Sequence, residues 1–131
     1  MERKFFAIGS ILAALAVAFG AFGAHGLQDH VAPQRLETFE TGVRYQMYHA
    51  LGLLGLAWAV GRWPDRRLNH GAALLMMGTL VFSGSLYLLV LTDTPWLGAV
   101  TPFGGVALIA GWALIAWRLL GGREPAGPSS A

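Results

Sequence analysis

Residues 68–92 read LNHGAALLMMGTLVFSGSLYLLVLT, a stretch of 25 residues without a single Asp, Glu, Lys or Arg. Three further stretches, 5–28, 45–61 and 94–117, also lack formal charge and are 24, 17 and 24 residues long. About 20 apolar residues, with a range of ~17–25, cross the ~30 Å hydrocarbon core of a bilayer as a helix. We therefore predict an all-α, polytopic membrane protein built as a four-transmembrane-helix bundle. Its spans are expected at about 5–24, 45–61, 71–91 and 102–120.

The overall composition excludes several other classes of protein. Hydrophobic residues make up 55% of the 131 residues and charged residues 12%, about half of the ~25% typical of soluble domains. A soluble all-α protein is the alternative, but the charge-free stretches leave too little polar surface to face water. The absence of cysteine excludes disulfides and thiolate metal sites. The net charge of +2 does not indicate a nucleic-acid partner, because the basic residues flank apolar stretches rather than forming a patch.

The basic residues also predict the orientation in the membrane. One side of the four-span topology carries Arg3, Lys4, Arg62, Arg66, Arg67, Arg118 and Arg123, and the other carries only Arg35 and Arg44. Cytoplasmic loops are enriched in Lys and Arg, so both termini are expected in the cytoplasm of a bacterial inner (plasma) membrane protein. A cleaved signal peptide is an alternative for the first span. Its apolar run is longer than the usual ~7–15 residues of a signal peptide.

The segments outside the spans differ in character. Residues 29–44 place Leu36, Phe39 and Val43 at helical spacing behind Pro33, which suits a first helical position. This predicts an amphipathic outer extension of the second helix, either continuous with it or bent onto the membrane surface. The last residues, 121–131 (GGREPAGPSSA), are expected to form a disordered cytoplasmic tail after a single domain at 1–120.

Small residues at three- and four-residue spacing predict where the helices touch. In lipid, helices associate through close packing and hydrogen bonds rather than through the hydrophobic effect, so small side chains mark the contact faces. The predicted packing positions are Gly9, Ala13, Gly20, Gly23, Gly78 and Gly111.

Polar side chains recur near the outer end of all four predicted spans. Because polar groups are costly in hydrocarbon unless they are satisfied, we expect them to gather in the outer leaflet. Thr101-Pro102 predicts a Thr N-cap with Pro at the first helical position, and the glycines that follow leave the backbone open to approach. The predicted polar cluster, a candidate binding site, comprises His25, Tyr45, His49, Ser83, Ser85, Tyr87, Thr101, Gly104 and Gly105. Hydrogen bonding between helices is the simpler explanation for each member taken alone.

Four motifs along the chain resemble those of a known family. They are GAFGAHGL at 20–27, YHALG at 48–52, FSGSLY at 82–87, and TPFGG at 101–105 followed by Gly111-Trp112. In this order and spacing they resemble the domain-of-unknown-function 423 family of YgdD-like small bacterial inner-membrane proteins, which are related to eukaryotic transmembrane protein 256. The resemblance covers about 5–118 and implies an inner-membrane location and four spans. It carries no established activity, so it assigns no catalytic residue.

The function favoured by these observations is a non-catalytic membrane component, such as a scaffold, an assembly factor or a lipid- or partner-binding subunit. No carboxylate lies inside the charge-free stretches, and no nucleophile–base–acid set is recognisable, so we do not expect an enzyme. The alternative is an oligomeric channel or transporter for an ion or small polar solute, with His49 as its proton carrier. A haem or metal held by His25 and His49 is a weaker alternative, so no cofactor and no metal are expected. Expected partners are the lipid bilayer and a second copy or another membrane protein.

Overall fold

Four long helices account for most of the computed structural model, which describes residues 1–121. They are α1 (Glu2–Phe22), α2 (Pro33–Arg62), α3 (Arg66–Thr92) and α4 (Thr101–Leu120). Two short elements, the π-helical turn η1 (Gly23–Leu27) and the 3-10 helix η2 (Pro95–Ala99), extend the helices at their connections. No strand occurs in this part of the chain, which confirms the prediction of an all-α fold. Except for Gly121, the predicted tail lies outside the described residues.

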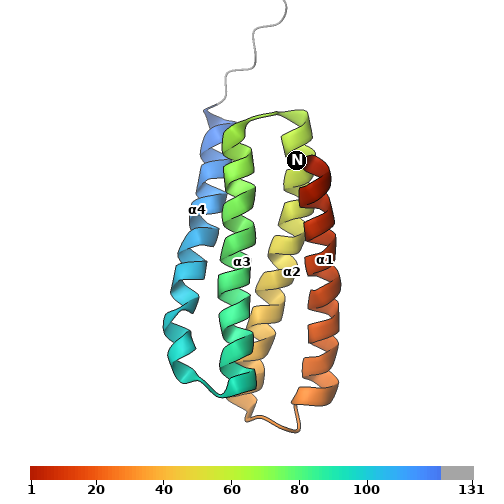
Figure 1. The fold of residues 1–131 in the computed structure, drawn as a ribbon, viewed down its shortest axis with the longest axis vertical. Coiled ribbons are helices and arrows are strands. Elements are labelled where there is room, and N and C mark those ends of the chain that lie inside the picture. The colour runs from red at the N-terminus through yellow and green to blue at the C-terminus, as the bar shows by residue number, and fades with distance from the viewer. Residues whose placement is uncertain (122–131) are drawn as a thin grey trace, which may run out of the picture.

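The helices run up and down in sequence order, with α2 and α3 in the middle and α1 and α4 on the outside (Figure 1). α1 packs on α2, α2 on α3, and α3 on α4. The N-terminus, the α2–α3 turn and the end of α4 meet at one end of the bundle. We call it the basic end, because it carries Arg3, Lys4, Arg62, Arg66, Arg67 and Arg118. The end that carries η1 and η2 is called the opposite end.

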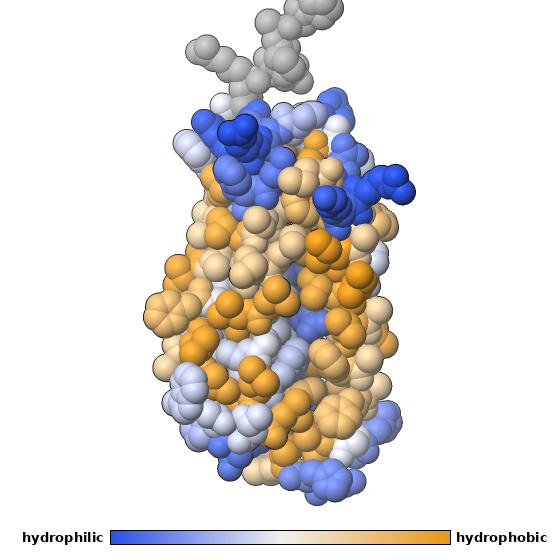
Figure 2. Space-filling model, in the orientation of Figure 1, coloured by the Kyte–Doolittle hydropathy of each residue, from blue (hydrophilic) through white to orange (hydrophobic). Residues whose placement is uncertain are grey.

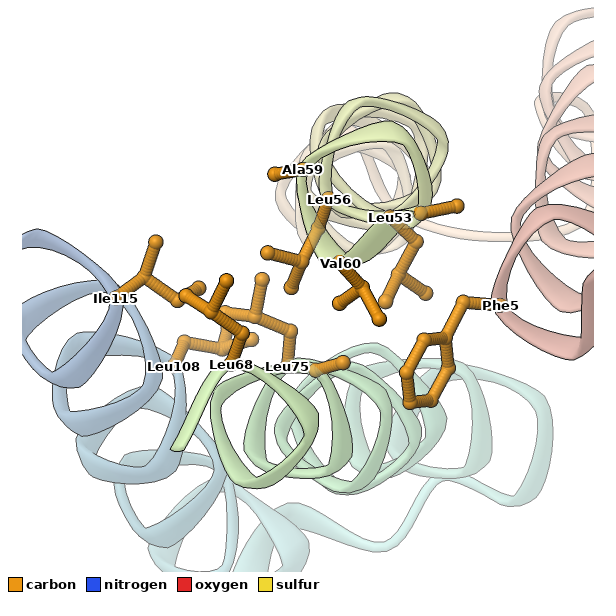
Figure 3. Close-up of a cluster of buried hydrophobic side chains, with 11 residues drawn as sticks. Phe5, Leu53, Leu56, Ala59, Val60, Leu68, Leu75, Leu108 and Ile115 are labelled. Atoms are coloured by element: carbon orange, nitrogen blue, oxygen red, sulfur yellow. The ribbon is translucent and has the colours of Figure 1, made fainter. Parts of the chain in front are cut away.

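Aliphatic side chains fill the half of the bundle nearer the basic end. Leu53, Leu68 and Leu75 are fully buried there, between the two central helices. Phe5 reaches in from α1 and Ile115 from α4, so both outer helices contribute to the same core (Figure 3). A second, smaller cluster of Leu27, Phe39, Leu89 and Val90 lies toward the opposite end.

α2 is one continuous helix of 30 residues, which decides the question left open for 29–44. Ala32 is extended (φ −63°, ψ 151°) and Pro33 starts the helix, as expected for a residue with fixed φ and no N–H. At ~1.5 Å per residue, α2 is about 45 Å long and exceeds a ~30 Å hydrocarbon core by several turns. The amphipathic extension is therefore a straight continuation and not a separate surface helix.

The outer surface of the bundle is largely apolar between two polar ends (Figure 2). Three stretches are long and apolar enough to cross a membrane: Glu2–Leu27, Arg66–Thr92 and Pro95–Leu120. Only 22% of the most apolar window of the first stretch is buried within the bundle, so most of its apolar side chains face outward. Large outward apolar surfaces of this kind mark contact with lipid or with other proteins. α2 does not reach the same hydropathy, because Tyr45, Gln46, Tyr48 and His49 fall within its apolar part.

Candidate functional site

The predicted polar cluster does not form a single site, because its members lie at three different helix–helix contacts. Tyr87 and Ser83 face α2, and Tyr87 also meets α1. His49 lies between α2 and α4, and Ser85 between α3 and α4. His25 is exposed in η1, and the structure gives it no hydrogen bond. Helical geometry explains the division, since residues two apart on a helix, such as Ser83 and Ser85, point in different directions.

Gln46 joins the first three helices. Its Nε2 donates to the carbonyl oxygen of Leu12 on α1 at 2.8 Å, and its Oε1 accepts from the Tyr87 hydroxyl on α3 at 2.7 Å. The Gln46 side chain is only 4% exposed, so both bonds lie in the interior. The Tyr87 ring packs against Phe19 and Phe39 at centroid distances of 5.1 and 5.0 Å. This bridge uses both ends of the amide.

Ser83 makes a second bond between the central helices. Its side chain is 2% exposed, and its Oγ donates to the carbonyl oxygen of Gly42 on α2 at 2.7 Å. A Cβ at Gly42 would lie 2.8 Å from a ring carbon of Tyr87. The glycine thus allows both Ser83 and Tyr87 to approach the α2 backbone.

His49 uses both of its ring nitrogens inside the bundle. Nδ1 lies 2.7 Å from the carbonyl oxygen of Tyr45, and Nε2 lies 3.1 Å from the indole Nε1 of Trp112 on α4. A carbonyl oxygen can only accept and an indole N–H can only donate, so the proton must be on Nδ1 and the lone pair on Nε2. The geometry assigns a neutral imidazole of this tautomer. A metal or haem iron at Nε2 would have to displace Trp112.

Tyr45 and Trp112 cover His49 from the lipid side. Tyr45 packs on Phe82 of α3 at a centroid distance of 4.6 Å and is 39% exposed. Trp112 is 43% exposed, and its indole lies over Gly52, where a Cβ would be 2.9 Å from the ring. These aromatic side chains thus connect α2, α3 and α4 around the imidazole.

The start of α4 differs from the prediction. Thr101 is not the N-cap: the 3-10 helix η2 leads directly into α4 through Val100, which has helical φ and ψ. The Thr101 hydroxyl instead lies 2.6 Å from Ser85 Oγ and 3.3 Å from the Leu97 carbonyl oxygen. Because η2 supplies carbonyl acceptors ahead of the first turn, the expected open helix terminus is absent from the structure.

Gly104 is likewise not open to a ligand. A Cβ there would lie 2.4 Å from the backbone nitrogen of Phe82, so the α4 backbone already rests on the α3 backbone. A Cβ at Gly105 would lie 3.8 Å from the Phe82 ring, an ordinary contact. The space that the sequence suggested for a ligand is thus occupied by α3.

The predicted packing positions lie where helices meet. A Cβ at Gly9 would be 2.9 Å from the Ala50 carbonyl oxygen, and one at Gly78 would be 2.8 Å from the Leu108 side chain. Gly20 and Gly23 face Val43 and Phe39 of α2, and Gly111 faces Leu75 of α3. Ala13 is partly buried on α1.

Three polar contributors escaped the sequence analysis: Gln46, Trp112 and Thr79. The stretch 45–61 was recognised by its lack of charge, and an uncharged amide such as Gln46 does not interrupt such a stretch. Trp112 was noted only within a motif, although an indole N–H needs an acceptor when it turns inward. Thr79, which is 2% exposed, donates to Leu75 of its own helix at 2.7 Å and joins no other element.

Charged contacts hold the two ends of the bundle. At the basic end, Asp65 caps α3 by accepting from the Arg67 N–H at 2.7 Å, and it also accepts from Arg118 Nε on α4. The bond from Arg118, and then the bond from the Arg67 amide, hold the pKa of Asp65 below its ordinary value of 3.8. At the opposite end, Arg35 pairs with Asp93 at 3.3 Å, a largely exposed pair that contributes little.

The chemistry available to these groups is mainly that of hydrogen bonding between helices. Within residues 1–121, no three His, Cys, Asp or Glu side chains come together as a metal site would require. In the same part of the chain, the buried side-chain atom left without a hydrogen-bond partner is Oδ1 of Asn69, near the basic end.

Comparison with known proteins identifies the family. A family model described as "Protein of unknown function (DUF423)" matches residues 19–105. The UPF0382 membrane protein YwdK of Bacillus subtilis is 45% identical over 114 residues, covering 86% of this chain and 93% of the relative. The UPF0382 inner membrane protein YgdD of Escherichia coli is 43% identical over 99 residues, 76% of each chain. No solved structure matches the chain. These matches confirm the resemblance seen in the four motifs and the prediction of a membrane protein: the chain belongs to the DUF423 family.

Proposed function

We propose that this protein is a non-catalytic component of the bacterial inner membrane, a scaffold, assembly factor or lipid- or partner-binding subunit. The observation that carries the proposal is the use of its buried polar groups. Gln46, Ser83 and His49 each bond to a different helix or to their own backbone. Groups committed in this way stabilise one arrangement of helices, and they are not free to bind or convert a substrate.

The proposed topology has four spans. α1 and α3 both start at the basic end, and each belongs to a stretch apolar enough to cross a membrane. α2 packs against both along its length and connects the end of one to the start of the other. A helix in that position has to return across the same hydrocarbon. The polar groups that lower its hydropathy, Gln46 and His49, are satisfied within the bundle, which makes the crossing tolerable.

Single cysteines test the topology, because the chain contains no native cysteine. Pro64 and Gln28 are exposed, uncharged and located at the two ends of the bundle, so their replacement leaves the charge balance unchanged. In spheroplasts, an impermeant maleimide is expected to label Gln28→Cys directly and Pro64→Cys only after the membrane is permeabilised. Labelling of both from one side would contradict four spans, and the reverse pattern would contradict cytoplasmic termini.

A flux assay tests the function. Purified protein in liposomes is expected to leave proton, cation and small-solute permeability at the level of protein-free vesicles, whereas its deletion in cells should alter a membrane complex or the lipid distribution. Flux above that level would refute the proposal.

An oligomeric channel or transporter is the second candidate. It is favoured by Tyr45 and Trp112, which place half-exposed polar aromatic groups next to His49 on the outer surface. A second copy docked there would be needed to enclose a pathway. Flux that His49→Ala abolishes would support this candidate, and flux that the variant retains would remove His49 from it.

A further inference from the structure

The outward face of α2 combines an apolar track with a cationic and aromatic end. Leu51, Gly55, Trp58 and Arg62 follow one another at steps of four, three and four residues, so they share one face of the helix. All four are exposed, Leu51 to 55% and Trp58 to 65%. A Cβ at Gly55 would meet nothing within 4 Å, so the track has a notch one turn below Trp58.

At the basic end of this track, a guanidinium lies on an aromatic pair. Arg62 Cζ is 5.5 Å from the centroid of the Trp63 ring, and Trp63 packs edge-on against Trp58 with centroids 5.4 Å apart. A guanidinium that stacks through its flat face keeps its N–H groups free at the edge, where they match the oxygens of a phosphate. Indoles also favour the depth at which lipid headgroups begin.

The start of α3 and the end of α4 repeat the arrangement. Arg67 Cζ lies 5.1 Å from the centroid of Trp117, whose ring is 62% exposed. The neighbouring bond between Arg118 and Asp65 joins the two helix ends that carry the pair. Within residues 1–121, the ion pairs are Arg118–Asp65 and Arg35–Asp93, so neither stacked arginine has an acidic partner there.

The charge of the basic end is complementary to an anion. Glu2, whose carboxylate lies against Gly61, and the paired Asp65 are the acidic residues at this end in the described chain. They are outnumbered by the six basic residues that define it. A ligand suited to both the track and its end needs a singly charged phosphate at the headgroup level and an acyl chain below it.

We propose that Arg62 with Trp58 and Trp63, and Arg67 with Trp117, form two binding sites for the phosphodiester headgroups of anionic phospholipids. At the α2 site, one acyl chain lies along Leu51 and the notch at Gly55. This inference rests on the proposed function and specifies its lipid-binding form. It does not depend on which side of the membrane the basic end faces.

Brominated lipids test the proposal with the full chain. The purified protein is reconstituted in phosphatidylcholine vesicles containing phosphatidylglycerol dibrominated near the headgroup, and quenching of tryptophan fluorescence measures the preference for phosphatidylglycerol. Arg62→Gln combined with Arg67→Gln is expected to lower this preference about fivefold for each site, the equivalent of ~1 kcal/mol per basic residue near an anionic surface. Arg35→Gln, at the opposite end, is the matched control and should leave it unchanged.

Arginine-to-lysine variants separate a built site from general surface charge. Arg62→Lys combined with Arg67→Lys keeps the charge but loses the planar fork over the indoles, so the preference should fall about two- to fivefold. A lysine variant with the full wild-type preference would overturn the proposal, because charge alone would then explain the binding. Equal quenching by brominated phosphatidylcholine and phosphatidylglycerol in the wild type would also overturn it. Neither result would create solute flux, so failure here is distinct from failure of the proposed function.

Discussion

Replacing Gly104 with alanine tests how closely α3 and α4 approach. The new Cβ would lie 2.4 Å from the nitrogen, 2.8 Å from the Cα and 2.9 Å from the Cβ of Phe82. Two of these atoms are backbone, so no change of rotamer can relieve the contact. Restoring an ordinary separation of at least 3.4 Å requires α4 to move away from α3 by about 1 Å at this point.

That displacement has two costs. Overpacking of a close contact costs ~1–3 kcal/mol, against which the better helix propensity of alanine returns ~1 kcal/mol. The Ser85–Thr101 hydrogen bond, 2.6 Å long and three residues from the clash, would also be stretched toward the limit of bonding. Hydrogen bonds between membrane helices contribute ~0.6 kcal/mol on average. The free energy of unfolding of Gly104→Ala should therefore fall by about 1–2 kcal/mol.

Gly105→Ala is the matched control, because it changes the neighbouring residue of the same helix in the same way. A Cβ at Gly105 would lie 3.8 Å from the Phe82 ring, so this variant should be as stable as the wild type or slightly more stable. The assay is reversible unfolding of the detergent-solubilised protein by increasing mole fractions of SDS, followed by circular dichroism. If both variants unfolded at the wild-type mole fraction of SDS, the close approach of the two backbones would be refuted.

Three further predictions concern single hydrogen-bonded groups. Tyr87→Phe leaves Oε1 of Gln46 without its donor, so the same unfolding assay should show a loss of about 0.6–1.7 kcal/mol, which largely disappears when Gln46 is already replaced by leucine. The ¹⁵N spectrum of His49 should show the proton on Nδ1 and a bare Nε2, and Trp112→Phe should shift the Nε2 resonance; a proton on Nε2 in the wild type would contradict the assigned tautomer. Asp65 has a folded-state pKa below 3.8, so its contribution to stability is fully present above that pH and is lost as the pH falls through the folded-state pKa. Asp65→Asn should therefore show a weaker loss of stability on acidification, and an unchanged acid profile would refute a bonded carboxylate.

Much of the fold follows from local sequence properties. Charge-free stretches longer than the bilayer is thick, and a proline at the start of the amphipathic segment, predict the helices and their order. The structure agrees to within a few residues for α4 (Thr101–Leu120) and extends α3 to Arg66, where Asp65 caps the helix. The start of α4 escaped the sequence because a 3-10 turn, and not a threonine side chain, supplies the acceptors ahead of it.

The sequence alone determined that this chain is helical, apolar on its outside and a member of a membrane-protein family, because hydropathy and motifs are read along the chain. It also showed which residue types must find partners away from water. Only the tertiary structure decided which partners they find: Ser83 bonds across to α2, whereas Ser85, two residues later, bonds to α4. Those choices depend on the rotation of each helix about its axis, which is set by close contacts such as that of Gly104 with Phe82. A single predicted polar cluster therefore became three separate contacts, because a rotation of 200° between residues two apart on a helix sends their side chains to different neighbours.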